Sequence, residues 1–403
     1  MKQNYDIIIV GAGISGLACA QKCNENSKDF LLIEKSSRIG GRVGSVKSEK
    51  FIFDLGFQVY NTAYNTMNRL LKNKPEEYLP FMPGAKIMIN DSSTIISDPM
   101  RNFSKILKTI FSTAASLSDK IRVLKLKNHL SNYSIELDDS EDIQTIDYLR
   151  GYGFSEKIIG NFFNPFFSGI FLEDRLETSS KFFKYVFSNF NSGLAVLPKN
   201  GMQEIPNQIF SNIEPSQILL NTQVDKILPG NKLELSNGST TLFNSLILTN
   251  ESCALAGQPS IKYNSVSTAY ISTNRSFKDS RYIHLFPQDD LINNIAFVSS
   301  VSPDYAPKDK TLLSISIIGK NEIIGIDKKL KQKMVFYFGG DITDYTVEKT
   351  INTKKATLNQ LPGFYENKIK QKGNVIFAGD HMFNGSIEGA AISGIKAYER
   401  IIK

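Results

Sequence analysis

The stretch that decides the fold is residues 5–42, which read YDIIIVGAGISGLACAQKCNENSKDFLLIEKSSRIGGR. Its first six residues are a short apolar run, typical of a strand buried in a parallel sheet. A glycine-rich turn over residues 11–16 separates this strand from a helix expected over about 17–26, and a second strand is expected over 30–34. The order strand, glycine turn, helix, strand predicts the βαβ unit of a dinucleotide-binding fold.

The three glycines of the turn have the G-x-G-x-x-G spacing. Gly11 permits a tight turn, Gly13 lets the backbone approach a pyrophosphate, and Gly16 allows close packing of helix and strand. The helix N-terminus offers N–H groups to the phosphates, and Glu34, at the end of the second strand, can accept hydrogen bonds from ribose. A turn of purely structural use would leave Glu34 unexplained. The predicted dinucleotide-binding residues here are Gly11, Gly13, Ile14, Ser15, Gly16 and Glu34.

A second element follows directly after Glu34. The glycine pair Gly40 and Gly41 can lay backbone against the same pyrophosphate, and Arg42 adds a permanent positive charge. A domain that binds only a nicotinamide dinucleotide does not need this element. The sequence therefore favours FAD over NAD, with Lys35 included among the contact residues.

The string LLIEKSSRIGGRV at residues 31–43 resembles the FAD fingerprint of the flavin amine oxidase superfamily, which includes monoamine oxidases, protoporphyrinogen oxidases and phytoene desaturases. FDLGFQVY at residues 53–60 is similar to the family's strand and glycine turn that reach the flavin ring. This resemblance implies non-covalently bound FAD. It also implies contacts from Gly56, Phe57 and Gln58, and from the backbone of Val224 to the adenine.

The string VIFAGDHMFNGSIEGAAISG at residues 375–394 is the second specific match. The resemblance implies that Gly379 and Asp380 lie at the ribityl and phosphate portion. It places Ile387, Glu388 and Ala390 at the isoalloxazine. Independently of the resemblance, Ser386 is a good N-cap for the last helix, whose start would stabilise negative charge on a reduced flavin. The alternative is an ordinary capped helix.

Along the chain, nucleotide-fold patterns at both ends and in the middle are interrupted by segments of different character. Helical spacing appears at residues 64–71, 102–130, 145–152 and 179–189, and β-rich runs at 260–345 suggest a second sheet. We expect an α/β fold with a Rossmann-like FAD-binding domain built from residues 1–63, 200–250 and 366–403. A substrate domain, with a mixed sheet and a helical insertion, would comprise residues 64–199 and 251–365.

The sequence is less specific about the residues that bind the substrate. Residues 154–190 hold ten of the 27 phenylalanines, which favours plain core but also fits an apolar pocket wall. Many amine oxidases of the family carry a lysine near the flavin, and alignment by eye puts Thr268 there, which argues against amine oxidation. His381 could be an acid–base group or a loop histidine. No catalytic residue is assigned.

Composition excludes several classes of protein. Three cysteines are too few for a disulfide scaffold and suit a reduced, cytoplasmic setting, and Cys19 and Cys23 are expected to pack on the first helix. Three distant histidines give no metal-ligand spacing. Neither a secretory signal nor an apolar stretch long enough to span a membrane is expected. The net charge of +7 is spread over the chain, which leaves peripheral contact with anionic lipid open, and no nucleic-acid motif accompanies it.

These observations predict an FAD-dependent oxidoreductase that transfers a hydride from an apolar substrate, such as an isoprenoid, a porphyrinogen or a hydrophobic amine, to flavin N5. The electron acceptor, oxygen or quinone, is left open, as is the oligomeric state. The alternatives are an FAD-dependent isomerase without net redox change, a non-catalytic FAD- or lipid-binding protein, and a nicotinamide-only dehydrogenase.

Overall fold

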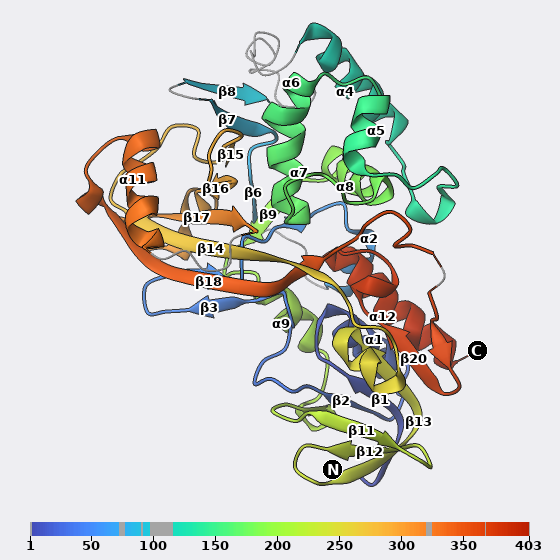
Figure 1. Ribbon diagram of the computed structural model, residues 1–403. Coiled ribbons are helices and arrows are strands. Elements are labelled where there is room, and N and C mark those ends of the chain that lie inside the picture. Colours follow the sequence, from blue (N-terminus) through green and yellow to red (C-terminus); the bar gives the residue numbers. More distant parts are fainter. Residues whose placement is uncertain are drawn as a thin grey trace.

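The computed structural model describes residues 2–71, 77–89, 92–96, 116–319, 325–366 and 368–402. Two large sheets dominate it, one in the lower part of Figure 1 and one above it, with a group of helices at the top. The two long strands β14 (Tyr263–Thr273) and β18 (Tyr345–Leu358) run from the upper sheet toward the lower one (Figure 1). This is the α/β architecture expected from the sequence.

The lower sheet has the parallel core order β10, β2, β1, β13, β20. Strand β13 is long: its first half pairs with the antiparallel strand β12, and its second half pairs with β20. The strands are β1 (Asn4–Val10), β2 (Phe30–Ile33), β10 (Ile218–Leu219), β11 (Val224–Leu228), β12 (Lys232–Leu235), β13 (Thr240–Thr249), β19 (Gln371–Lys372) and β20 (Val375–Ala378). Strands from three distant parts of the sequence therefore complete one sheet.

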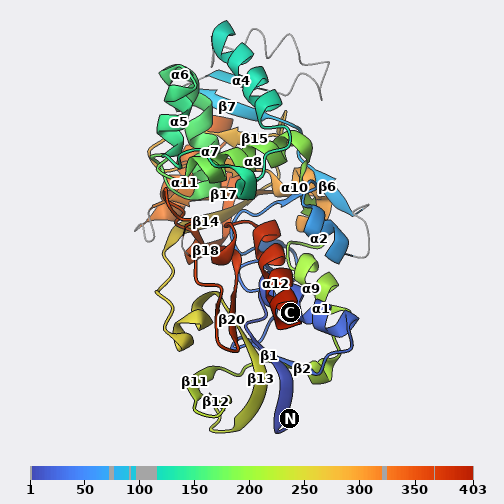
Figure 2. The ribbon, with the colours of Figure 1, turned by 90° about the vertical axis from the view of Figure 1, so that its right-hand side faces the viewer.

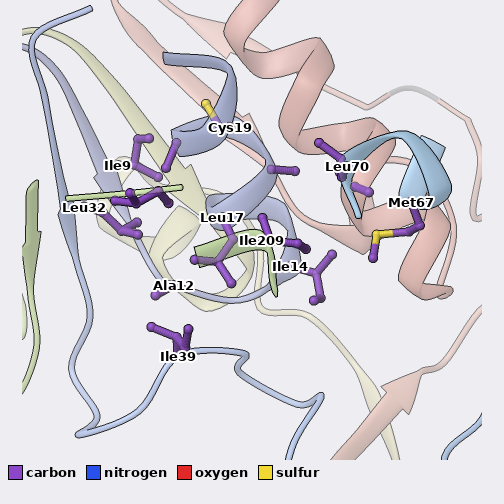
Figure 3. Close-up of a cluster of buried hydrophobic side chains, with 14 of the residues drawn as sticks. Ile9, Ala12, Ile14, Leu17, Cys19, Leu32, Ile39, Met67, Leu70 and Ile209 are labelled. Carbon is purple, nitrogen blue, oxygen red and sulfur yellow. The ribbon is translucent and has the colours of Figure 1, made fainter. Parts of the chain in front are cut away.

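Strand β1 is apolar on both faces because both faces are covered. Ile7 and Ile9 pack under the helices, whereas Ile8 and Val10 pack in a second cluster with β11, β12 and β13. Figure 3 shows Ile9 beside residues of helix α1. The covering helices are α1 (Ile14–Glu25), α2 (Asn65–Leu70), α9 (Glu204–Phe210) and α12 (Ile387–Ile401).

Helices α1 and α12 make the closest helix–helix contact of this layer, side by side in Figures 1 and 2. A Cβ atom at Gly394 of α12 would lie 2.1 Å from the backbone oxygen of Ser15, so only glycine fits there. Cys19 and Cys23 are buried on α1 as free thiols, which confirms their expected packing role.

The upper sheet has the order β18, β14, β17, β16, β15, β7, β8. Its remaining strands are β7 (Ala85–Ile89), β8 (Ser92–Ile96), β15 (Ile283–Leu285), β16 (Asn294–Ala296) and β17 (Thr311–Ile318), with helices α10 (Val298–Val301) and α11 (Ile326–Phe338). The second sheet expected over residues 260–345 is confirmed. The helical insertion expected within residues 64–199 did not include β7 and β8. Strand β8 pairs with its chain neighbour β7, and β7 also pairs with β15, which lies far away in sequence.

The helical group consists of α4 (Leu117–His129), α5 (Thr145–Gly151), α6 (Glu156–Ile158), a π-helical turn (Ile159–Phe163), α7 (Asn164–Phe171) and α8 (Ser180–Ser192). The helices predicted at residues 145–152 and 179–189 correspond to α5 and α8, within a few residues. Of the helix predicted over 102–130, residues 102–115 lie outside the described residues. Ser116 caps α4 by accepting a hydrogen bond from the amide of Asp119 at 3.1 Å.

Two small sheets connect the large ones: β3 (Ser45–Lys47) with β4 (Ile52–Asp54), and β5 (Tyr60–Asn61) with β9 (Ala195–Pro198) and β6 (Tyr78–Pro80). The segment at residues 53–60, expected to form a strand and a glycine turn, is divided between β4 and β5. Gly56 divides it, because its φ of +112° turns the backbone out of the extended conformation. Short 3₁₀ turns occur at Ile135–Leu137, Pro215–Gln217, Asn250–Ala256, Pro303–Tyr305, Ile342–Asp344 and Asp380–Met382.

Candidate FAD site and substrate cavity

The glycine turn has the geometry that each of its glycines suggested. Gly11 has a φ of +102°, and a Cβ atom at Gly16 would lie 1.9 Å from the Gly11 carbonyl oxygen. A Cβ atom at Gly13, by contrast, would meet no atom within 4 Å, so open space lies beside the backbone there. The hydroxyl of Ser15 is buried and has no hydrogen-bond partner in the described part of the chain. Ile14 packs into the core below. The turn thus presents bare backbone and an unused hydroxyl at the start of α1.

Glu34 lies directly over this turn. Its Oε2 accepts a hydrogen bond from the Ala12 amide at 2.8 Å, and its Oε1 accepts from the amide and hydroxyl of Ser36 at 2.9 and 2.8 Å. Only 8% of the residue is exposed. The Thr222 amide donates to the Glu34 backbone oxygen at 3.0 Å, which brings the buried Val224, two residues further on, to the same end of the sheet. The Thr222 backbone therefore links the segment before Val224 to Glu34.

The second glycine element packs on the first. The Gly40 amide donates to the Ala12 carbonyl at 2.8 Å, and a Cβ atom at Gly41 would lie 3.2 Å from the Gly13 Cα. Lys35, by contrast, points toward solvent, where its Nζ lies 3.7 Å from Glu251. The two glycine turns therefore form one backbone surface around the open space beside Gly13.

Arg42 joins the two ends of the chain. Its guanidinium pairs with Asp380 at 2.6 Å and lies 5.3 Å from the ring centroid of Tyr263. Asn250 donates a further hydrogen bond to Asp380 at 2.6 Å. Desolvation works to lower the pKa of Arg42, but the Asp380 carboxylate outweighs it and the pKa is raised. Gln58 donates from Nε2 to the Arg42 carbonyl at 2.7 Å, so the segment at residues 53–60 also lies beside Arg42.

Strand β20 and helix α12 supply the C-terminal residues. The Gly379 amide donates to the Ser393 hydroxyl at 3.0 Å. Ser386 caps α12 by accepting from the Gly389 amide at 2.8 Å, which confirms the predicted N-cap. Ile387 and Ala390 pack partly buried on the core cluster under the sheet.

Glu388 is turned toward helix α2. Its two carboxylate oxygens accept hydrogen bonds from the amides of Thr66 and Met67 at 2.7 and 2.9 Å, and burial raises its pKa. This contact could not be predicted, because periodicity places Glu388 in the first turn of α12 but does not indicate which neighbour its side chain meets.

Gly56 and Thr268 face one another across the junction of the two large sheets. A Cβ atom at Gly56 would lie 3.8 Å from the Thr268 hydroxyl oxygen. Thr268 is fully buried, and its hydroxyl has no partner among the described residues. The Nδ1 atom of His381 likewise has no hydrogen-bond partner among the described residues. Desolvation lowers the pKa of the His381 ring to about 4. His381 is therefore neutral at pH 7.

An apolar cavity of about 530 Å³ begins at Phe57 and Val59 and extends between the upper sheet and the helices α4, α7 and α8. Phe57 directly follows Gly56, so the cavity reaches the segment predicted to contact the flavin. The phenylalanines of residues 154–190 serve both suggested purposes. The walls include Phe162, Phe166, Phe167, Phe187 and Phe190, and the core of the helical group includes Phe154, Phe163, Phe167, Phe171, Phe182 and Phe183.

Several polar residues of this region were not expected from the sequence to contribute to the site. Asp54 is buried and accepts hydrogen bonds from Ser45 (2.6 Å), Met202 (2.9 Å) and Tyr305 (2.8 Å), while burial raises its pKa to about 6. Its place in the FDLG string was the available signal. Asn250, which holds Asp380, and Asn294, which lines the cavity, lie in strings without any motif.

The described residues contain no group of three or more histidine, cysteine, aspartate or glutamate side chains arranged to hold a metal ion. No helix within the described ranges has the length and apolar character needed to cross a lipid bilayer.

A βαβ unit with bare glycine backbone and an acid at the end of its second strand, in a chain that also holds an apolar cavity, is typical of dinucleotide-dependent oxidoreductases. Comparison with known proteins identifies the family within this class. Residues 14–402 match the family described as flavin containing amine oxidoreductase, and the chain belongs to that family. It is an FAD-dependent oxidoreductase, and the resemblance seen in the sequence is confirmed.

Among relatives, coproporphyrinogen III oxidase of Bacillus subtilis is 22% identical over 96% of this chain and 94% of its own length. Other matches are partial. Human amine oxidase [flavin-containing] B is 32% identical over 18% of this chain and 14% of its own length, and a Drosophila melanogaster relative is matched over 12% of its length.

Two solved structures show the same fold over almost the whole chain. An oxidoreductase from Methanosarcina mazei has a TM-score of 0.76 at 14% identity, covering 98% of this chain and 100% of its own. Putrescine oxidase bound to putrescine has a TM-score of 0.73 at 14% identity and covers 99% of each chain. At these identities the likeness concerns the fold alone.

Proposed function

We propose that this protein binds FAD along the surface formed by the two glycine turns, Glu34 and the start of α12, and oxidises an apolar substrate held in the cavity that begins at Phe57. The observation that carries the proposal is the continuity of the two sites. Phe57 lines the cavity, and the adjacent Gly56 lies opposite the unpartnered hydroxyl of Thr268. A substrate in the cavity would therefore lie next to a cofactor at Gly56.

The residues present fit FAD. The open space beside Gly13 supports a pyrophosphate there, to which the amides at the start of α1 and the Ser15 hydroxyl would donate, and Glu34 would accept from the ribose. We assign the FAD-binding part to residues 1–63, 200–250 and 366–403, and the substrate part to residues 64–199 and 251–365. The proposed contacts further include Lys35, Gly40, Gly41, Arg42, Gly56, Phe57, Gln58, Val224, Gly379, Asp380, Ile387, Glu388 and Ala390.

When bound, the flavin supplies the acceptor for a hydride at N5. The chain contributes position and environment. The phenylalanine walls hold an apolar substrate and exclude water, and the amides at the start of α12 favour negative charge beside them. No described residue of the cavity wall is a histidine or a carboxylate. The wall itself therefore offers no proton-transfer pair of the usual kind, consistent with hydride transfer in which the cofactor carries the chemistry.

The names of the relatives indicate what to test. A coproporphyrinogen oxidase, a diapophytoene desaturase and amine oxidases are all similar to this chain, so the substrate candidates are a porphyrinogen, an isoprenoid and a hydrophobic amine. Purified protein should show the flavin absorption bands, and anaerobic titration with the correct class should bleach them. Oxygen and a quinone, mixed separately with the reduced protein, would identify the electron acceptor.

Bleaching by none of the three classes would refute the proposed oxidation. Substrate and product of equal oxidation level would instead support a flavin-dependent isomerase. Peripheral contact with a membrane surface stays a prediction, and sedimentation with anionic vesicles tests it directly.

A further inference from the structure

The cavity wall includes a deeply buried polar group that has no hydrogen-bond partner among the described residues. Asn294 begins strand β16, lines the cavity and is 3% exposed. Its amide nitrogen has no hydrogen-bond partner in the described part of the chain. Buried amide groups without partners are rare and costly, so such a group in a cavity wall indicates a ligand that supplies the partner.

The neighbouring residue establishes which atom of the Asn294 amide is left over. Asn293 Nδ2 lies 3.0 Å from the Pro165 carbonyl, which can only accept, so this atom is a donor. The same Nδ2 donates to the Asn294 side-chain oxygen at 2.9 Å. The remaining atom of Asn294 is therefore the NH₂ group, and the wall offers a donor at this point.

The charges around the cavity agree with a donor that awaits an acceptor. Among the described lining residues there is no carboxylate, and the two charged ones are Lys120 and Lys127 of helix α4. A protonated amine would therefore find no carboxylate to pair with among the described lining residues, and its transfer from water into this apolar wall is unfavourable. An oxygen acceptor, neutral or anionic, meets no such penalty.

We infer that the cavity selects an apolar substrate carrying a hydrogen-bond-accepting oxygen, which Asn294 Nδ2 binds, and that it discriminates against cationic amines. This inference rests on the proposed function in taking the cavity as the substrate site. Asn294 is then a specificity-determining residue. The Phe57 end of the cavity receives the part of the substrate to be oxidised.

The test is calorimetric titration of the FAD-loaded protein with three twelve-carbon probes: 2-dodecanone, dodecanoate and dodecylamine at pH 7. We expect the ketone and the carboxylate to bind about tenfold more tightly than the amine, as one satisfied buried hydrogen bond implies. Asn294→Leu should weaken ketone binding by about tenfold on the same basis. Asn244→Leu makes the same change at an exposed position of β13, outside the cavity wall, and should leave the ketone affinity unchanged.

Equal binding of amine and ketone by the wild type would overturn the inference, as would an unchanged ketone affinity in a folded Asn294→Leu variant. If circular dichroism shows that Asn294→Leu does not fold, Asn294→Asp replaces it. That variant keeps the acceptor for Asn293 but loses the donor, and its preference should shift to dodecylamine; a retained ketone preference would overturn the inference.

Calorimetry measures binding of the probe to the protein, whether or not electrons pass to the flavin. A protein that binds the ketone through Asn294 but whose flavin no candidate substrate bleaches would refute the proposed oxidation and leave the specificity intact. A protein whose flavin is bleached by a hydrophobic amine, and which binds that amine as tightly as the ketone, would refute the specificity and support the proposed oxidation.

Discussion

Replacing Glu34 by alanine is the sharpest test of the cofactor site. The carboxylate is the predicted partner of the FAD ribose, and it lies over the glycine turn with 8% of the residue exposed. One hydrogen bond to a charged group contributes about 1.5–3 kcal/mol. The dissociation constant for FAD should therefore rise about 10- to 150-fold in Glu34→Ala.

The same substitution also removes acceptors within the protein. The amides of Ala12 and Ser36 lose the oxygens that lie 2.8 and 2.9 Å away, which should lower the unfolding free energy of the FAD-free protein by about 1–3 kcal/mol. Glu34→Gln keeps one side-chain oxygen and should lie between wild type and Glu34→Ala in both measurements.

Titration of the FAD-free protein, followed by flavin fluorescence and calorimetry, measures the affinity, and thermal unfolding with and without FAD measures the stability. Glu49→Ala removes an exposed glutamate between β3 and β4 and serves as the control. The ribose assignment is wrong if folded Glu34→Ala binds FAD within a factor of about two of wild type, since that would correspond to less than about 0.5 kcal/mol.

The remaining predictions concern stability. Gly394→Ala puts a Cβ atom 2.1 Å from a backbone oxygen of α1 and should lower the unfolding free energy by about 1–3 kcal/mol in denaturant titrations, whereas Gly151→Ala, with open space, should not. Because burial raises the Asp54 pKa to about 6, Asp54 destabilises the fold as pH rises from 4 to 6, by about 3 kcal/mol in all. Asp54→Asn should lack this slope, and an identical slope would contradict the argument. Asp380→Asn leaves the Arg42 guanidinium without its carboxylate and should lower the melting temperature more at low salt than at high salt.

The local parts of the fold could be predicted because their causes are local. The apolar run of β1, the glycine turn and the acid after β2 are separated by short, fixed spacings, and the structure places Glu34 over Ala12 as those spacings suggest. Ser386 likewise has its cap partner only three residues away. The interacting groups are 22 residues apart in the first case and three in the second, so both contacts form within one short stretch of the chain.

The contacts that define the site were not predictable in the same way. Arg42 and Asp380 were each expected near the cofactor, but nothing in either string indicates that they pair with each other. The donor at Asn294 is unpaired because Asn293 holds its oxygen and because α7 and α8 enclose the cavity around it. A single asparagine in a strand gives no sign of either. Such features arise from tertiary packing and not from local pattern.

The pairing of β13 with β1 on one side and β20 on the other has a consequence for biosynthesis. During translation the first strands leave the ribosome long before β20 and α12 exist, and the edge of β13 that β20 later covers stays open meanwhile. We expect the nascent chain to remain unable to retain its coenzyme until the closing strand is made. Pigment should thus appear only after β20 and α12 have left the ribosome, and cellular flavin shortage should leave a protease-sensitive pool of chains that contain both elements.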